Sequence, residues 1–131
     1  MAFRVVYQAD LAGDAYPLAW KLRRGHEDKL SEDQLELIED VVATLEARGS
    51  EIDSELQSAM DGRWAMARLA ATDRAVLRMS VAELLARPGS PARVVLDEAI
   101  EIARTFGSEE SGRFVNGVLD RAARRLRPAE F

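Results

Sequence analysis

The sequence has no cysteine and only one histidine among its 131 residues. The lack of cysteine excludes disulfides, thiolate metal sites and a cysteine nucleophile, and it fits a protein of the reducing cytoplasm. His26 lies in a polar, turn-like stretch and offers almost no material for acid–base catalysis or a catalytic triad. The isolated glycines form neither a GxGxxG nor a P-loop pattern. We therefore expect a protein that is not an enzyme and that has no metal site and no cofactor.

Long apolar runs are also missing. No stretch of 18 apolar residues occurs, and the N-terminus lacks the basic and apolar regions of a signal peptide. The sequence therefore predicts neither secretion nor a membrane span. Aromatic residues make up 6% of the chain against 47% hydrophobic residues, so the core must be mostly aliphatic. A chain of this length and composition is expected to form one compact domain, residues 1–131.

Charge is distributed unevenly along the chain. The net charge is −5, which argues against indiscriminate nucleic-acid binding. Residues 27–61 contain 12 acidic and 2 basic residues, so this segment carries −10 and the remainder carries +5. Of the 18 basic residues all but Lys21 and Lys29 are arginine. Arginine suits bidentate phosphate contacts, although a G+C-rich genome gives the same bias. The sequence leaves open whether segment 27–61 has a role beyond solubility.

Apolar spacing and the positions of glycine and proline predict helices in the first half of the chain. Gln34 stands three residues after Ser31, which resembles a capping box. The basic cluster at 21–26, KLRRGH, is interpreted either as the solvated end of a helix or as a functional patch. The predicted helices are 2–11, a short one opened by Pro17, one from Ser31 to Gly49, and one from Ser50 to Gly62.

The second half continues in the same pattern. Thr72 is expected to cap a helix over 73–87 that is apolar around most of its circumference, as helices buried between neighbours are. Ser90 and Pro91 are predicted as N-cap and first residue of the next helix. No segment alternates as a strand does. We therefore predict an all-α fold of about seven helices in two subdomains, about 1–62 and 63–131.

The turn 107–108 is predicted to separate the last two helices. Gly107 is expected to end the first as a left-handed C′ glycine, and Ser108 to cap the second. The last helix gathers its apolar residues on one face, namely Val115, Val118, Leu119, Ala122 and Leu126.

On the flank of this helix lies Phe114, with Glu110, Arg121 and Arg125, while Arg113 lies further round. An aromatic ring beside arginines can stack on an unpaired base while the guanidinium groups meet phosphates. Alternatively, Phe114 packs under a neighbouring helix and the arginines cover the helix dipole. Helix geometry alone favours this second interpretation.

Four features of the second half form a distinctive set: DRAVLRMSVAELL at 73–85, the turn at Pro91, LDEAIEIARTFG at 96–107 and SGRFVNGVLD at 111–120. Together they resemble the NusB family of bacterial transcription antitermination factors. VVYQADLAGD at 5–14 also resembles the first helix of the family. Residues 16–64 match only as a helical pattern.

The resemblance implies a non-catalytic protein with two helical subdomains. Family members pair with NusE, a small-subunit ribosomal protein, and together hold the single-stranded boxA element of nascent RNA. The assembly joins the elongating RNA polymerase complex and suppresses premature termination in ribosomal RNA operons. Asp73 falls where an acidic side chain of the family faces NusE. Tyr7, Glu110, Arg113 and Phe114 fall at the RNA-side positions of the family. We also expect Arg4 and Arg121 to contact RNA.

The start of the chain differs from the family pattern. Relatives usually carry an arginine-rich stretch before the first helix, whereas only Arg4 stands near the start here. Either translation begins further upstream, or the chain is short and depends on NusE for RNA binding. The alternative function is a NusB-like protein-interaction module that has lost most RNA binding. Whether the chain also forms a homodimer is left open by the sequence.

Overall fold

The computed structural model describes residues 2–24, 30–62 and 65–131, which form helices and no strand. The predicted all-α fold is therefore confirmed. Two short 3₁₀ helices, η1 (Met66–Arg68) and η2 (Pro128–Glu130), accompany the α-helices. The α-helices are α1 (Ala2–Ala12), α2 (Tyr16–Arg24), α3 (Glu32–Ala59), α4 (Ala71–Ala86), α5 (Ala92–Phe106) and α6 (Glu109–Leu126).

The described residues contain six α-helices instead of about seven because α3 continues through Gly49, where we expected it to end. The backbone kinks at Arg48, with φ −126° and ψ 22°, and the Arg48 guanidinium donates two hydrogen bonds to Glu51. Beyond the kink, Ile52 and Leu56 are fully buried in the core. The packing of these two side chains stabilises the helix beyond Gly49, although glycine has a low helix propensity.

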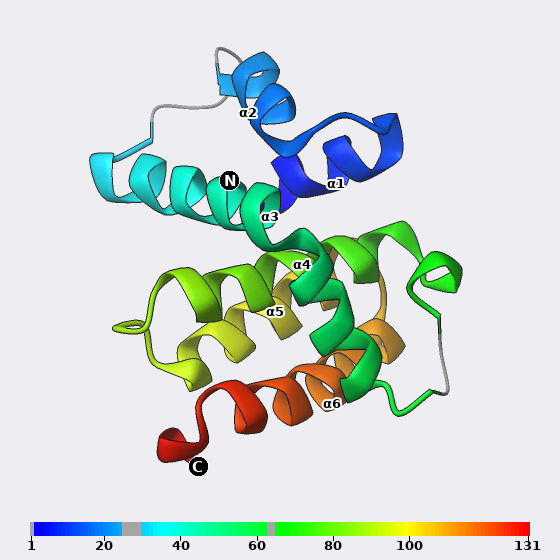
Figure 1. Cartoon of the computed structure of the whole chain (residues 1–131). Coiled ribbons are helices and arrows are strands. Elements are labelled where there is room, and N and C mark those ends of the chain that lie inside the picture. The colour runs from blue at the N-terminus through cyan, green and yellow to red at the C-terminus, as the bar shows by residue number, and fades with distance from the viewer. Residues whose placement is uncertain (1, 25–29, 63–64) are drawn as a thin grey trace.

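Figure 1 shows two layers, with α1, α2 and the first half of α3 above α4, α5 and α6. Helix α3 descends from the upper layer to the lower, and α4 packs against α1, α3, α5 and α6. A small cluster of buried residues lies in the upper layer, around Trp20 and Ile38. A larger one joins α1 and α3 to the lower helices. This larger cluster contains side chains from both sides of the predicted subdomain boundary near residue 62. The boundary therefore stays a prediction.

The predicted cap of α4 was wrong. The helix begins at Ala71 with Ala70 at the N-cap, so Thr72 lies inside the first turn instead of capping it. Tertiary contacts fix this entry: Leu69 is buried, and the Arg74 guanidinium donates to the carbonyls of Met66 and Leu69 at 3.4 and 3.3 Å. The entry is therefore held by contacts that lie outside the local capping pattern.

The start of α5 is shifted by one residue. Pro91 is the N-cap, and no side chain of the cap bonds to the helix. Instead, the Glu130 carboxylate accepts a hydrogen bond of 2.8 Å from the backbone N–H of Ala92. In the same tail, the Arg127 guanidinium donates to the carbonyl of Leu84 at the end of α4. The C-terminal tail thus caps two helix ends at once.

Gly107 ends α5 as expected, but for a different reason. Its φ of −117° is not left-handed, so conformational freedom is not what requires glycine. A Cβ atom here would lie 2.7 Å from both the Ala103 carbonyl oxygen and Ser111 Oγ, which is too close. The predicted cap of α6 is confirmed, because Ser108 accepts from the N–H of Ser111 at 3.1 Å. The capping box at Ser31 is confirmed as well.

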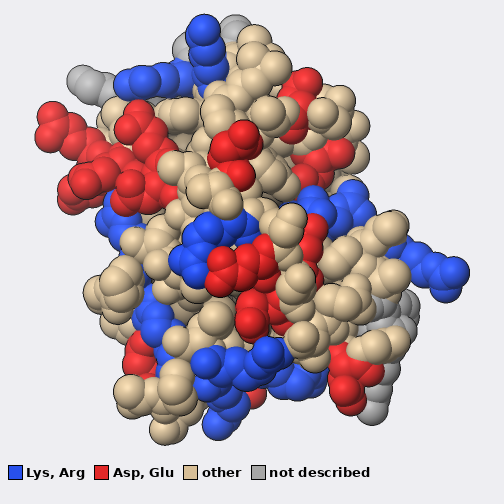
Figure 2. Space-filling model, viewed as in Figure 1, with Lys and Arg blue, Asp and Glu red and all other residues tan. Residues whose placement is uncertain are grey.

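Charged side chains are segregated on the surface. Figure 2 shows basic side chains gathered over α2 at the top and acidic ones over the first half of α3 at the upper left. In the described part of the chain, no helix is long and apolar enough to cross a bilayer.

Candidate functional site

Phe114 lies in a cavity of about 400 Å³ between the beginnings of α4 and α6. Its ring is half-buried and packs on the edge of the larger core cluster, so it is neither wholly inside the core nor fully exposed. We call this cavity the Phe114 pocket; its lining residues are Arg68, Leu69, Ala70, Asp73, Ser108, Glu110, Ser111 and Phe114.

Close packing between α5 and α6 positions the Phe114 ring. Gly112 is buried, and a Cβ atom there would lie 2.7 Å from Cγ of Arg104 on α5. The glycine therefore lets the two helices approach. Ser108 fixes the first turn of α6 by its cap, so the ring two residues after Gly112 is held on a rigid element.

Asp73 faces Phe114 across the same pocket. Its carboxylate is half-buried, and among the described residues its Oδ1 atom is buried without a hydrogen-bond partner. Burial raises the pKa of the Asp73 carboxyl above its ordinary value, and a hydrogen bond from Ser111 opposes part of that rise. Because Asp73 lines the pocket, its carboxylate can accept a hydrogen bond from an N–H donor that enters the pocket, either a basic side chain or the amino edge of a base.

The remaining predicted residues of α6 are placed unequally. Glu110 lines the Phe114 pocket, and Arg113 is exposed beside it. Arg121 is exposed, but its Nε donates a 2.5 Å hydrogen bond to the carbonyl of Ala59 at the end of α3. Part of the Arg121 side chain therefore holds α3 and α6 together, a task that its place on the helical wheel did not predict.

Arg4 and Tyr7 line a second cavity, of about 310 Å³, where α1, α2, α4 and α5 meet. We call it the Phe106 pocket. Its lining residues are Phe3, Arg4, Tyr7, Gln8, Arg23, Thr72 and Phe106.

Three aromatic rings form one row in this pocket. Phe3 is buried and stacks on Tyr7, with ring centroids 5.6 Å apart. The centroid of the Phe106 ring lies 4.9 Å from that of Phe3, with the ring planes tilted by 32°. Phe106 is 45% exposed although it is large and apolar. The Phe106 ring is therefore exposed to solvent while it packs on the buried ring of Phe3.

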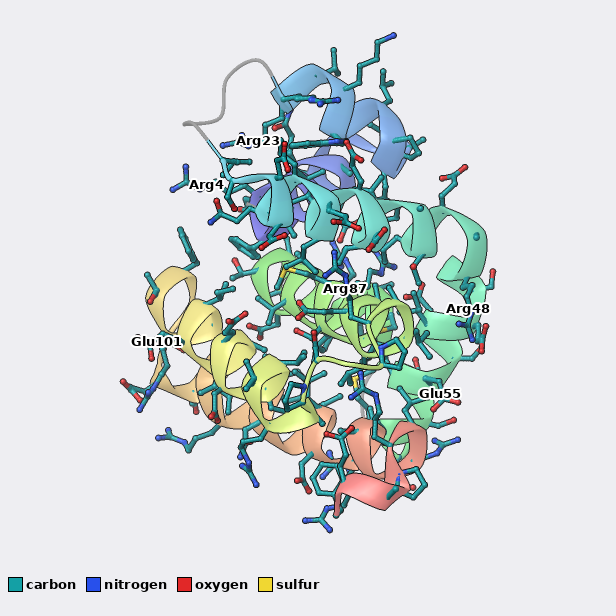
Figure 3. All side chains as sticks on the ribbon, turned by 90° about the vertical axis from the view of Figure 1, so that its left-hand side faces the viewer. Arg4, Arg23, Arg48, Glu55, Arg87 and Glu101 are labelled. Carbon is teal, nitrogen blue, oxygen red and sulfur yellow. The ribbon has the colours of Figure 1, made fainter. Side chains whose placement is uncertain are left out.

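Sequence reasoning missed Phe106 and Arg23 as site residues. Arg23 belongs to the basic cluster of 21–26, which was interpreted as either a helix end or a patch; residues 25–29 lie outside the described residues. Its Nη1 donates to Gln8 Oε1 at 3.2 Å, which turns it toward α1. Figure 3 shows Arg4 and Arg23 on the same face of the molecule. The position of α2 against α1 is a tertiary fact, and no local signal in the sequence reveals it.

A polar network holds α1 and α2 in place above α4. The Arg78 guanidinium on α4 donates to Asp10 at 3.0 Å and to Asp53 at 2.9 Å. The Tyr16 hydroxyl donates to the same Asp10 at 2.8 Å, and burial raises the pKa of Tyr16 above its ordinary value. Because the Asp10 side chain is 4% exposed, these bonds fix α1 and with it Arg4 and Tyr7.

The two pockets are neighbours. Thr72 lines the Phe106 pocket and Asp73 lines the Phe114 pocket, one residue apart in the first turn of α4. Phe106 and Ser108 are likewise separated only by Gly107. A single extended ligand can therefore reach both pockets across the start of α4.

Comparison with known proteins gives one consistent result. The family model described as the NusB family matches residues 1–124. The transcription antitermination protein NusB of Anaeromyxobacter dehalogenans is 38% identical over 132 residues, covering 98% of this chain and 89% of that protein. NusB of Desulfitobacterium hafniense is 36% identical over 121 residues, covering 92% and 81%.

Solved structures agree with these matches. The chain is similar to NusB of T. maritima, with a TM-score of 0.86, 31% identity, and coverage of 98% of this chain and 89% of that one. It is also similar to a chain of a crystal structure of the antitermination factors NusB and NusE in complex with double-stranded RNA. That match has a TM-score of 0.84 and 27% identity, and covers 95% of this chain and 91% of that one.

Proposed function

This chain belongs to the NusB family of non-catalytic transcription antitermination factors, and from that membership we propose a function as a two-partner adaptor. One partner is NusE, the small-subunit ribosomal protein. The other is the single-stranded boxA element in transcripts of ribosomal RNA operons. The adaptor works in the cytoplasm on the elongating RNA polymerase complex, where it suppresses premature termination.

The observation that supports RNA binding best is the half-buried ring of Phe114 in a cavity. A ring held in this way can stack on an unpaired base without first being ordered, so little conformational entropy is lost on binding. Arg68 lines the same cavity, and Arg113 next to Phe114 in sequence is exposed, so both are available to meet phosphates. The proposed RNA-contact residues are Arg4, Tyr7, Glu110, Arg113, Phe114 and Arg121.

Asp73 is the proposed contact for NusE. Its carboxylate lines the Phe114 pocket, where it can accept a hydrogen bond from an N–H donor of the partner. A basic side chain of NusE would supply that donor and would offset the burial of the carboxylate charge. RNA and NusE would then meet at one pocket, with the stacking ring and the carboxylate on neighbouring helices.

The experiment that tests this function measures boxA RNA affinity with and without NusE, at two salt concentrations. The wild-type chain with NusE is expected to bind RNA, and Phe114→Ala should weaken binding by about 1–3 kcal/mol. NusE binding of the same variant should stay unchanged. If Phe114→Ala lost affinity for RNA and for NusE equally, the role of Phe114 would be in core packing alone.

A second candidate is a protein-interaction module that keeps NusE and has lost most RNA binding. The net charge of −5 and the two carboxylates of the Phe114 pocket favour it. Under this alternative, NusE binds with normal affinity while boxA RNA adds no stability to the complex. The same titration therefore separates the two functions.

A further inference from the structure

The Phe106 pocket has a property that the adaptor function does not by itself require. Its exposed ring, Phe106, rests on the buried ring of Phe3, which also supports Tyr7. Such a support fixes the ring before any ligand arrives, which lowers the entropic cost of stacking a base on it. The Phe106 ring lines an open cavity at the surface, where a flat aromatic ligand can stack on it.

The charged residues that line this pocket in the described part of the chain are both arginines. Arg4 comes from α1 and Arg23 from α2, and no carboxylate is among the described residues that line the cavity. The bond from Arg23 Nη1 to Gln8 Oε1 holds the guanidinium over the pocket. Guanidinium groups beside an exposed ring suit a nucleotide, because they can bind its phosphate while the ring stacks on its base.

We propose that the Phe106 pocket binds a second unstacked nucleotide of the same RNA strand that reaches Phe114, with Arg23 of α2 as its phosphate contact. This proposal rests on the RNA binding proposed above and adds Phe106 and Arg23 to it. The two nucleotides lie on either side of the start of α4, where Thr72 and Asp73 separate the pockets.

The first test compares Arg23→Ala with Arg24→Ala. Arg24 is the matched control, since it lies on the same helix, is exposed and pairs with Glu39 at 3.7 Å outside the pocket. Binding of single-stranded boxA RNA is measured in the presence of NusE over a range of salt concentrations. Arg23→Ala should lower the magnitude of the slope of log affinity against log salt by about 0.7, and Arg24→Ala should leave it unchanged.

The second test asks whether the pockets hold different nucleotides. Phe106→Leu keeps an apolar side chain on Phe3 but removes the aromatic face, and it should weaken RNA binding about five- to 150-fold. Combined with Phe114→Ala, the two fold-losses should multiply, as they do for independent sites. If the double variant binds no more weakly than Phe114→Ala alone, both rings serve one nucleotide and the proposal is wrong.

Other outcomes decide the remaining cases. Loss of RNA binding in Phe114→Ala with wild-type binding in both Arg23→Ala and Phe106→Leu overturns the second pocket and leaves the adaptor function standing. Weaker binding of Arg23→Ala to NusE in the absence of RNA assigns the pocket to the protein partner and also overturns the proposal. If the wild-type chain with NusE binds no boxA RNA, the adaptor function and the second pocket fail together. Thermal melting of Arg23→Ala equal to that of the wild type shows that its effect is not unfolding.

Discussion

The Phe114 pocket and the Phe106 pocket each present an aromatic ring, but the charges around the two rings differ in sign. Among the described residues, Asp73 and Glu110 line the first together with one arginine, Arg68. The second is lined by Arg4 and Arg23 and, among the described residues, by no carboxylate. A phosphate is attracted to the second pocket and not to the first, where a hydrogen-bond donor is favoured instead.

The comparison indicates a division of labour on one surface. Under the proposed function, electrostatic attraction for an RNA backbone would come from α1 and α2, in a chain whose net charge is −5. Selectivity for a protein donor or a base edge would come from α4 and α6. The two pockets also differ in support, since the Phe106 pocket depends on the polar network of Arg78 and the Phe114 pocket depends on the packing of α5 on α6.

The largest expected effect comes from breaking that network. Arg78→Ala removes the nearer of the two cations that pair with the buried Asp10, and only Arg74 remains, with its Nε 3.9 Å from Asp10 Oδ2. A buried pair broken in this way costs about 3 kcal/mol of the free energy of unfolding. Urea denaturation measures the loss. Arg48→Ala is the control, because the pair of Arg48 with Glu51 is exposed to solvent and should contribute little to stability.

The same variant sharpens the comparison between the pockets. At urea concentrations below the unfolding midpoint, the Arg78→Ala variant is still folded. Its helices α1 and α2 should be less firmly held, so the RNA contacts proposed for Arg4 and Tyr7 should weaken. The NusE contact proposed for Asp73 should be retained, since α4 and α6 keep their own packing. An equal loss of NusE and RNA binding would show that the two pockets are one cooperative unit.

Charge reversal at Asp73 is expected to have the next largest effect. Asp73→Lys places a cation where a donor is proposed to bind, so NusE affinity should fall by about 2 kcal/mol or more. RNA binding by the variant should be kept, because the added charge attracts phosphate. Isothermal titration with each partner checks both results. Should RNA binding fall while NusE binding stays normal, Asp73 belongs to the RNA side of the pocket.

Much of the fold could be predicted from local patterns. The helices α1 and α2, the capping box at Ser31 and the cap at Ser108 all follow from rules that act within a few residues. Two local predictions failed where tertiary packing decides. The break predicted at Gly49 is only a kink at Arg48, since Ile52 beyond it is buried. Thr72 does not cap α4, because the buried Leu69 and the hydrogen bonds of Arg74 fix the start of that helix.

The candidate site shows the same limit. Phe114 was found from its place on the last helix and from the resemblance to a family, whereas Phe106 gave no signal as an exposed ring. The hydrogen bond from Arg23 to Gln8 joins α2 to α1 across 15 positions. The bond from Arg121 to the Ala59 carbonyl spans 62. Such pairings are set by the packing of helices, which helical periodicity does not encode.

A smaller effect is expected at Arg4. The side chain is exposed and lines the Phe106 pocket, so Arg4→Ala should remove one phosphate contact without harming the fold. The salt slope of RNA binding should become shallower by about 0.7, and RNA affinity at low salt should fall more than at high salt. Arg93→Ala, on the exposed face of α5, is the control. A slope equal to that of the wild type would remove Arg4 from the RNA surface.

The smallest effect concerns the pH dependence of the Phe114 pocket. Burial raises the pKa of Asp73 in the folded chain above its value of about 3.9 in the unfolded chain. The folded state therefore binds the proton more tightly, and the ionised carboxylate lowers stability at neutral pH. Asp73→Asn removes that charge and should make the protein slightly more stable than the wild type at pH 7. The difference should shrink as the pH falls through the folded pKa and should vanish below about 3.9.

Urea denaturation of both proteins at neutral and acidic pH measures this difference. Asp97→Asn provides the control, since Asp97 is exposed on α5 and its replacement should change stability little at either pH. A stability difference that stays constant with pH would mean that the Asp73 carboxylate is well solvated. In that case burial would not favour a donor at Asp73. Only the signs of the charges would then distinguish the pockets, Asp73 and Glu110 in one against Arg4 and Arg23 in the other.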